Sequence, residues 1–453
     1  MANTYLTRTQ VAGNRQIFTQ SIWFKLTSTA DQVFISSYND ANNYNCFFLE
    51  SGNQVLQVLW KKSGSNAALL NTTRKFRDTS AWYHVVLAVD TTQGTAANRI
   101  KLYVNGVQET SFSTATYPNQ NESIEVNDNN TNQRIGALNT DTFFQGVASY
   151  VAQIDGTQEL PTVFGETDAT TGEWKIKTSI TPSVAWGNNG FLVLKDGNSL
   201  TDASPNSNNF TVAGGTLTKT EDCPSNVFAT MNPLALYHSS GGTLSNGNNS
   251  YVWSNYQINT RSTLGMPKGK FYWEQKCLGD EGSNRIGMCT SAFTNYIDTD
   301  STDAHYNSTG NGGIYLMMSA ASTSWQRTNN DTSKNVDTYT NATALATNNI
   351  IMNAVDVDAG KYWIGINGTW FYSGDPAAGS NPQITFTNSG GDDLHVFLGS
   401  GTNNSRSFSF NFGNGYFGTT AVSSAGTNAS GNGIFEYDVP AGYTALSTKG
   451  LNL

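Results

Sequence analysis

Charged residues are scarce in this chain. Only 13% of its 453 residues are Asp, Glu, Lys or Arg, about half of the usual share. The charges sum to −9, and lysine and arginine gather only in short runs such as Lys61–Lys62. Because binding to phosphate backbones needs a basic face, nucleic acid is excluded from the expected partners.

Long apolar runs are absent as well. No stretch of the sequence approaches the roughly 20 residues that cross a bilayer, so we expect no membrane insertion. Residues 1–18 are polar and lack the apolar core of a secretion signal. We therefore expect the chain to be made and folded in a cytoplasm, and any role outside a cell to be reached without secretion.

Cysteine and proline are rare. The four cysteines form no Cys-x-x-Cys or Cys/His cluster, so the sequence predicts free thiols and no structural zinc. There are 10 prolines but 43 glycines, and 12% of the residues are aromatic. This balance is typical of many short strands joined by polar turns, with few helices.

Apolar residues that are present alternate with a period of two. Val85, Leu87 and Val89 share one face of a predicted strand, and the residues around Phe24 follow the same pattern. Half-buried strands need a second layer, and two stacked sheets are the simplest solution. The predicted fold class is all-β: two antiparallel jelly-roll β-sandwiches in series with a β-rich connector. The predicted domains are residues 1–165, a connector over 166–230, and residues 231–453 with a Gly/Ser-rich C-terminal extension.

Two Asn-Gly dipeptides mark corresponding places in the two predicted sandwiches. Residues 82–106 end on Asn105-Gly106, and residues 353–368 end on Asn367-Gly368. Both segments are predicted to form strand, turn, strand, followed by a tight Asn-Gly bend. The tail around Phe435 and Tyr443 is expected to dock back on the second sandwich.

Aromatic residues near predicted strand ends and loops are the first candidates for ligand contact. Exposed rings stack on sugars, and nearby Asn and Asp side chains can bond to hydroxyl groups. We expect loop surfaces to carry the binding, because rigid sandwiches concentrate function there. His84, which follows Trp82 and Tyr83 on a strand, is expected to be a hydrogen-bonded structural residue. The candidate ligand-binding residues are Tyr44, Trp60, Tyr315, Trp325, Trp370 and Tyr372.

The first predicted domain resembles laminin G-like, concanavalin A-like jelly rolls. The resemblance rests on Trp82-Tyr83-His84-Val85, Asp90 and residues 102–106. The second predicted domain resembles SPRY-type sandwiches, through residues 269–274, Ile286-Gly287, 355–358 and 363–368. The joint order of these motifs resembles a family of structural proteins of marine tailed bacteriophages, notably phages of cyanobacteria.

The resemblance implies a non-enzymatic virion protein, exposed on the particle surface, that attaches to a host-surface glycan or receptor as part of a tail or surface fibre. Other virion proteins are the implied partners, and a homo-oligomer, favoured as a trimer, is implied by the fibre role. Two alternatives remain open: a capsid decoration protein that stabilises or covers the shell, and a glycan-degrading enzyme.

Two further expectations follow from the domain types. Enzymes with a concanavalin A-like fold use carboxylates spaced as Glu-x-Asp-x-x-Glu, which the sequence lacks, so we expect no catalytic residues. Laminin G-like domains often hold calcium through Asp side chains. Three carboxylates in one predicted loop of the second domain, which suit the oxygen preference of Ca²⁺, make Asp298, Asp300 and Asp303 the candidate ligands.

Overall fold

The computed structural model describes residues 4–79, 81–170, 172–195, 197, 199–236, 242–253, 259–279, 284–291, 313–319, 322–329, 345–387, 393–400 and 406–452. For residues 259, 315–319, 322–329 and 400 only the backbone is described. These residues form an all-β structure of almost entirely antiparallel sheets, which confirms the predicted fold class. The chain divides into two compact units, residues 1–219 and 220–453, and each is described by itself.

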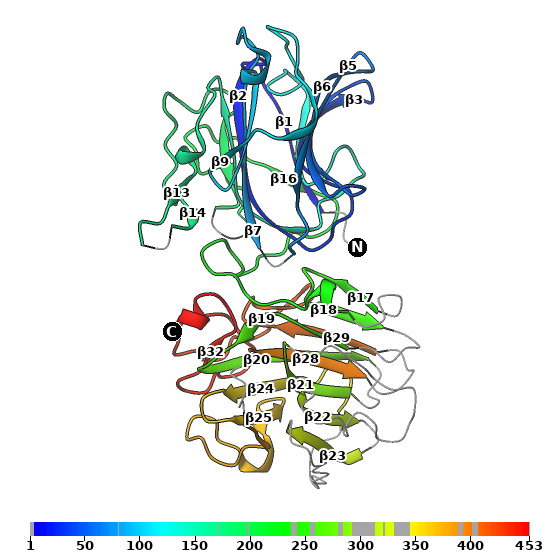
Figure 1. Cartoon of the computed structure of the whole chain (residues 1–453), viewed down its shortest axis with the longest axis vertical. Helices are drawn as coiled ribbons and strands as arrows, with labels where there is room; N and C mark the ends of the chain where they lie inside the picture. The colour runs from blue at the N-terminus through cyan, green and yellow to red at the C-terminus, as the bar shows by residue number, and fades with distance from the viewer. Residues whose placement is uncertain are drawn as a thin grey trace. The chain divides into compact units, whose positions relative to one another are not determined.

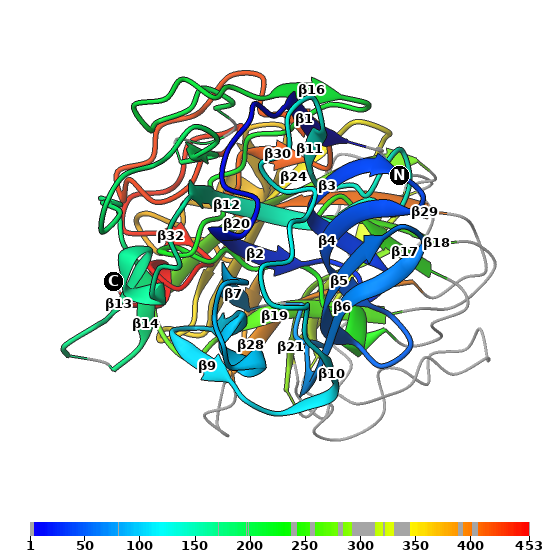
Figure 2. The same ribbon diagram turned by 90° about the horizontal axis from the view of Figure 1, so that it is seen from above.

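The described strands of the first unit form two stacked sheets (Figure 1). Seen from above, β3 to β6 lie side by side in one curved layer (Figure 2). In order across the eight-stranded sheet the strands are β10 (Phe112–Thr116), β6 (Ser65–Lys75), β5 (Val55–Lys62), β4 (Asn43–Glu50), β3 (Gln32–Asp40), β11 (Asn132–Ile135), β1 (Tyr5–Thr9) and β16 (Thr211–Ala213). The six-stranded sheet runs β15 (Phe191–Val193), β12 (Gly146–Asp155), β2 (Ile17–Leu26), β7 (Trp82–Asp90), β8 (Ile100–Val104) and β9 (Val107–Glu109).

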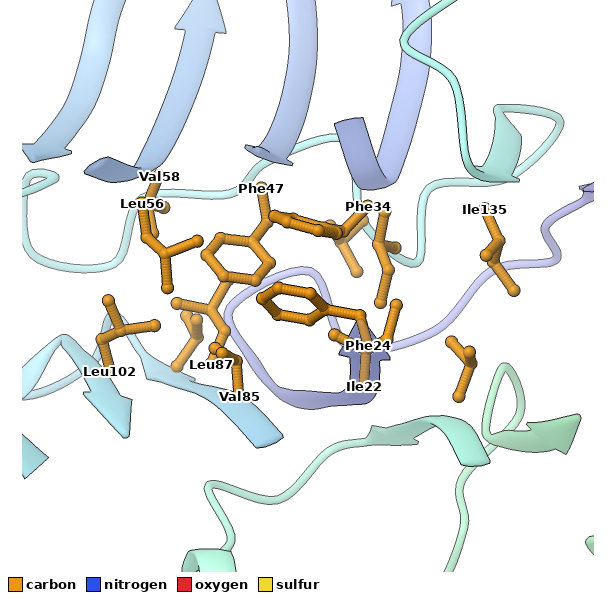
Figure 3. Packing of buried hydrophobic residues seen from close by; sticks show 14 of the residues in the cluster. Ile22, Phe24, Phe34, Phe47, Leu56, Val58, Val85, Leu87, Leu102 and Ile135 are labelled. Atoms are coloured by element: carbon orange, nitrogen blue, oxygen red, sulfur yellow. The ribbon is translucent and has the colours of Figure 1, made fainter. Parts of the chain in front are cut away.

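The core of the first unit lies between these sheets. Phe24 of β2 meets Phe34 of β3 with ring centroids 4.3 Å apart, and Phe34 lies 5.3 Å from Phe47 of β4. Figure 3 shows these three rings between the layers, with Val85 and Leu87 reaching in from β7. The period-two pattern of the sequence thus identifies the inward face of β7 correctly.

The predicted connector is not a separate element. Of its residues 166–230, those up to 219 belong to the first unit, where β15 pairs with β12 and β16 pairs with β1. The hairpin of β13 (Gly165–Thr167) and β14 (Trp174–Ile176) also lies here. Phe164 and Ile180 pack against Val86 and Ala88 of β7, so this polar-looking segment covers the outer face of the six-stranded sheet.

The second unit repeats the two-layer plan in its described residues. Its core contains Trp273 stacked on Tyr362. Phe408, Phe410 and Phe412 alternate with polar residues in the sequence, which predicts one shared face, and all three are buried in this core. One sheet runs β17 (Gly242–Ser245), β18 (Ser250–Trp253), β29 (Arg406–Asn411), β20 (Lys270–Gly279), β24 (Ile350–Asp356), β25 (Lys361–Ile366) and β26 (Thr369–Trp370), with β27 (Ile384–Thr385) on β25 and β32 (Thr444–Ala445) on β20. The other runs β19 (Asn259–Met266), β28 (Leu394–Ser400), β21 (Asn284–Thr290), β22 (Gly313–Ser319) and β23 (Ser322–Asn329).

Short elements complete the two units. A small hairpin pairs β30 (Tyr416–Phe417) with β31 (Thr420–Ala421). The described 3₁₀ turns are η1 (Ala96–Asn98), η2 (Pro161–Val163), η3 (Pro233–Ala235), η5 (Phe371–Ser373) and η6 (Gly450–Asn452). None of the helices in the described part of the chain has the length and apolar character needed to traverse a bilayer.

The stretches 271–276 and 285–288 lie close together in the sequence, which predicts that they form paired strands. This prediction is wrong, because β20 and β21 belong to different sheets. The two strands carry apolar residues that meet across the core, since Trp273 and Ile286 lie in the same buried cluster. All four cysteines are free thiols, as predicted.

The C-terminal tail docks on the second unit, as the sequence predicts. Phe435 and Tyr443 are buried against the outward side chains of the nine-stranded sheet, Tyr272 of β20 and Trp363 of β25. The ring of Phe435 meets Tyr272 edge-on at 4.9 Å. The outer face of this sheet is therefore a second, smaller core.

The two Asn-Gly turns have the same detailed construction. Asn105 bonds to His84 through its backbone N–H and its side-chain oxygen, at 2.8 Å each, and Asn367 bonds to Ile350 in the same way at 2.9 and 2.8 Å. Both asparagines and both glycines have positive φ, which suits this turn type. Each glycine also lies against an aromatic ring of the docked segment: Trp174 on Gly106 and Tyr437 on Gly368.

Replacing Gly106 with alanine should destabilise the first unit by about 2 kcal/mol. A Cβ at Gly106 would lie 2.5 Å from the Trp174 ring, and φ is +80°. Thermal unfolding of the full chain and hydrogen exchange over residues 165–176 measure the effect. Gly156→Ala has a positive φ and open space, and Gly94→Ala has open space without a positive φ, so they are graded controls. Equal stability of the Gly106→Ala and Gly94→Ala variants would contradict the packing argument.

Candidate functional site: a tyrosine row on the first unit

The six predicted ligand-binding aromatics have different surroundings. Trp60 is only 1% exposed and packs in the core of the first unit, so its assignment to a sugar-binding surface is wrong. The reason is the strand period, which places Trp60 on the same inward face of β5 as Leu56 and Val58. Tyr315 and Trp325 lie on β22 and β23, and their side chains are outside the described residues.

Trp370 and Tyr372 lie beside the docked tail of the second unit. Trp370 is partly buried and meets Tyr272 edge-on at 6.3 Å. Tyr372 is 44% exposed and has φ +54°, and the next residue, Ser373, has φ +53°. Left-handed backbone at two successive non-glycine residues costs energy, so the surrounding packing holds this turn in place. Tyr372 remains a predicted contact residue, whereas Trp370 contributes mainly to packing.

Tyr44 belongs to a row of side chains across four adjacent strands, which we call the tyrosine row. It consists of Arg134 on β11, Tyr38 on β3, Tyr44 on β4 and Lys61 on β5. Tyr38 and Tyr44 are direct partners in the β3–β4 register, and Tyr44 and Lys61 are partners in the β4–β5 register. The two rings stack with centroids 5.9 Å apart and planes 24° from parallel.

Cations lie at both ends of this row. The Arg134 guanidinium carbon is 5.6 Å from the Tyr38 centroid, and Lys61 Nζ is 5.9 Å from the Tyr44 centroid. Both distances are within the range of cation–π attraction. Because β11 and β4 flank β3 on opposite sides, the two faces of Tyr38 are covered by Arg134 and Tyr44. Tyr44 is likewise enclosed by Tyr38 and Lys61.

The row lies on the outer face of the eight-stranded sheet. Cys46, Phe48 and Leu59 surround it in a cluster separate from the core between the sheets. Phe48, Leu59 and Tyr38 are only partly buried. An outer sheet face normally carries polar residues, so this partly exposed apolar face with cations is unusual. The sequence-based reasoning missed Tyr38 and Arg134, because the pairing of β3 with β11 joins segments about 100 residues apart.

Tyr44 of the row is held in its protonated form. Burial is the main cause that raises the pKa of Tyr44, and the neighbouring Cys46, Tyr38 and Asp141 raise it further. The Tyr44 phenol can therefore donate an O–H. Side chains stand roughly perpendicular to a sheet, so rings that stack on one another across strands direct their hydroxyl ends away from it.

Burial raises the pKa of Glu125 in the first unit, and the nearby charge of Arg15 partly offsets this effect. Asp128 shares a hydrogen bond with it, and Arg15 forms ion pairs with both carboxylates, at 3.6 and 2.9 Å. Glycoside hydrolysis needs carboxyl groups roughly 5–9.5 Å apart. Glu125 and Asp128 are in direct contact, so their geometry suits a loop anchor rather than a hydrolytic pair.

His84 and Ser21 have the residue types of a nucleophile and base, but not the proton arrangement. Ser21 Oγ lies 2.9 Å from His84 Nε2, while Trp174 Nε1–H donates to His84 Nδ1 at 2.9 Å. Because Nδ1 accepts, the neutral ring carries its proton on Nε2 and donates to Ser21. A general base would need Nε2 free to accept. His84, which stacks on Trp23 at 4.5 Å, is therefore a structural residue, as predicted.

The predicted calcium ligands Asp298, Asp300 and Asp303 lie outside the described residues. Among the residues that are described, no group of three or more His, Cys, Asp or Glu side chains could hold a metal ion. The calcium site therefore stays a prediction from the sequence.

The fold and the site together define an all-β protein whose first unit contains a concanavalin A-like jelly-roll domain. Residues 2–157 match the model of the family Laminin_G_3, described as the Concanavalin A-like lectin/glucanases superfamily. A search of curated proteins found no match.

Three solved structures are similar at low scores. The SPRY domain of human HERC1 is 12% identical with a TM-score of 0.27, over 40% of this chain and 96% of that one. A native heptameric SAP-like pentraxin from Limulus polyphemus is 14% identical with a TM-score of 0.31, over 47% and 89%. Domain 4 of AbnA, a GH43 extracellular arabinanase from Geobacillus stearothermophilus solved with arabinotriose, is 18% identical with a TM-score of 0.25, over 33% and 64%. Scores this low support no conclusion about function.

Proposed function

We propose that the protein is a non-enzymatic, glycan-binding component of a phage particle, exposed on the virion surface and used for attachment to the host. The observation that carries the glycan-binding part is the match of residues 2–157 to a lectin/glucanase superfamily. The partly exposed apolar face around the tyrosine row supplies a surface on which a glycan can lie. The virion role rests on the order of sequence motifs along the chain.

The binding surface in this proposal is the outer face of the eight-stranded sheet. Phe48 and Leu59 offer apolar contact, and Gln57, two residues before Leu59 on β5, is a partly buried polar residue. Apolar surface beside a few polar groups is typical of sugar sites. Other virion proteins and further copies of this chain, most simply in a trimer, are the proposed partners, and many copies would amplify weak single-site binding.

Phe48→Ser should weaken binding of the full-length protein to host-surface polysaccharide about tenfold, a loss of about 1.4 kcal/mol. Val107→Ser on the other sheet, where the side chain is 62% exposed, is the matched control and should bind like the unchanged protein. A glycan array and a host-cell binding assay provide the readouts. Failure to bind any glycan or cell would refute the attachment role and favour the decoration alternative, and release of reducing sugar would show an enzyme.

A further inference from the structure

The tyrosine row is built for an anionic group rather than for ring stacking. Stacking on a sugar needs a free aromatic face, but both faces of Tyr38 and Tyr44 are occupied within the row. The row instead offers its phenol hydroxyls, with a guanidinium at one end and an ammonium at the other. Hydroxyl donors between two cations are complementary to carboxylate or sulfate oxygens.

Arg134 gives an independent indication of an anion-binding site. The residue is only 8% exposed, and its Nε has no hydrogen-bond partner within the described part of the chain. Its Nη1 donates a long hydrogen bond to the Leu138 carbonyl oxygen, at 3.5 Å. A buried N–H donor without an acceptor is costly, and an anionic oxygen that bonds to it removes this cost. Among the described ion pairs, neither Arg134 nor Lys61 has an acidic partner.

Two acidic residues, Asp141 and Asp40, lie near the tyrosine row, and their charges act on different groups. The charge of Asp141 acts on Tyr44, so it opposes an incoming anion. Asp40 is held by the side chain of Asn43 and the backbone of Asn42, and its charge acts on Glu125 instead. Asp141 is therefore the acidic neighbour whose charge acts on Tyr44, while Asp40, two residues from Tyr38 on β3, is engaged by Asn42 and Asn43.

We propose that the tyrosine row binds an acidic glycan, with Arg134 and Lys61 contacting its carboxylate or sulfate groups and the phenols of Tyr38 and Tyr44 donating hydrogen bonds to the same oxygens. This inference rests on the proposed glycan-binding function and names its ligand class. Neighbouring Phe48 and Leu59 would contact the apolar face of an adjoining sugar unit. Attraction between exposed charges is screened by salt, so the recognition is expected to weaken as ionic strength rises.

The test compares one polysaccharide in two forms. Full-length protein is titrated with a polyuronate and with the same polymer after reduction of its carboxyl groups, and a sulfated neutral polymer distinguishes sulfate from carboxylate as the recognised group. We expect at least tenfold tighter binding to an anionic form. Equal affinity for the charged and the reduced polymer would overturn the inference but leave glycan binding intact, whereas no binding to any polymer would overturn the proposed function itself.

Substitutions locate the site. Lys61→Gln and Arg134→Gln should each weaken binding to the acidic polymer about fivefold to tenfold, and Asp141→Asn should strengthen it about twofold to threefold. Arg134→Lys keeps the charge without the planar fork and is expected to fall between the unchanged protein and Arg134→Gln. Lys268→Gln in the second unit removes the same charge at an exposed position and should change nothing. Unfolding curves of each variant show whether the fold is retained, and equal losses for Lys268→Gln and Lys61→Gln would refute the row as the site.

Discussion

Replacing Glu274 with alanine should lower the free energy of unfolding of the second unit by about 4 kcal/mol. This carboxyl group of β20 is fully buried and accepts hydrogen bonds from four donors: the backbone N–H groups of Glu436 and Tyr437, at 2.9 and 2.8 Å, the Tyr272 hydroxyl at 2.9 Å and the Asn411 amide at 3.4 Å. Each buried donor left without an acceptor costs about 1–3 kcal/mol. Denaturant unfolding of the full chain measures the loss.

The same carboxyl group predicts how the second unit responds to pH. Burial raises the pKa of Glu274 to about 7, against the opposing effect of its hydrogen bonds. A pKa raised by folding means that the folded state retains a proton that the unfolded chain releases. The contribution of this proton to the stability of the second unit is complete below about pH 4.5 and is lost as pH rises through 7. The total loss in the free energy of unfolding is about 3 kcal/mol. Glu274→Gln cannot titrate, so its pH profile over this range should be flatter than that of the unchanged protein.

Hydrogen exchange locates this effect. Residues 423–446 should exchange faster at pH 8 than at pH 5.5, after correction for the intrinsic rate, because the tail bonds directly to Glu274. The Glu274→Gln variant, measured at the same two pH values, provides the reference. Identical pH profiles for the unchanged protein and Glu274→Gln would show that this carboxyl group does not control docking of the tail.

Acid should destabilise the first unit by about 3 kcal/mol between pH 6.5 and 4.5 through His84. Burial lowers the pKa of His84 to about 3, so the folded state excludes a proton that the unfolded chain binds. The stability contributed by the neutral ring is complete above pH 6.5 and is lost as pH falls towards 3. Protonation of Nδ1 would place its N–H against the Trp174 Nε1–H that now donates to it.

His84→Gln is the variant that tests this prediction. A glutamine offers one acceptor and one donor, as the neutral ring does, but it does not titrate. Calorimetric unfolding of the full chain between pH 4.5 and 7.5 should show a smaller acid shift for the variant, and exchange over residues 165–176 should rise first in the unchanged protein. An acid shift of equal size in both proteins would assign the effect to other groups.

The sequence predicts well what depends on neighbouring residues along one strand. The inward faces of β7 and the stretch 407–412 follow from alternation alone, and the Asn-Gly turns follow from the two residues that form them. The same alternation applies to Trp60, which lies two residues after Val58 and four after Leu56. These positions already indicate that its side chain is buried. A tryptophan close to a strand end is not thereby exposed.

The sequence predicts poorly those features that depend on contacts between strands far apart in the chain. The tyrosine row needs β11 beside β3, and no local pattern places Arg134 over Tyr38. The apolar run at residues 190–194 predicts the short strand β15, but the polar composition around it conceals the edge strand β16, because three residues carry little periodic signal. The burial of Glu274 likewise depends on a tail more than 160 residues further along the chain.

The docked segments have a consequence for the order of synthesis. Residues 157–213, which follow the last long strand β12 directly, cover one sheet of the first sandwich and add an edge strand to each sheet. The first unit can therefore finish folding while the rest of the chain is still on the ribosome. The second sandwich cannot, because Phe435 and Tyr443 are the residues that cover Tyr272 and Trp363. Until translation passes residue 446, that sheet exposes aromatic surface, which favours aggregation of nascent chains. A premature stop after β31 would therefore harm solubility far more than its short length suggests.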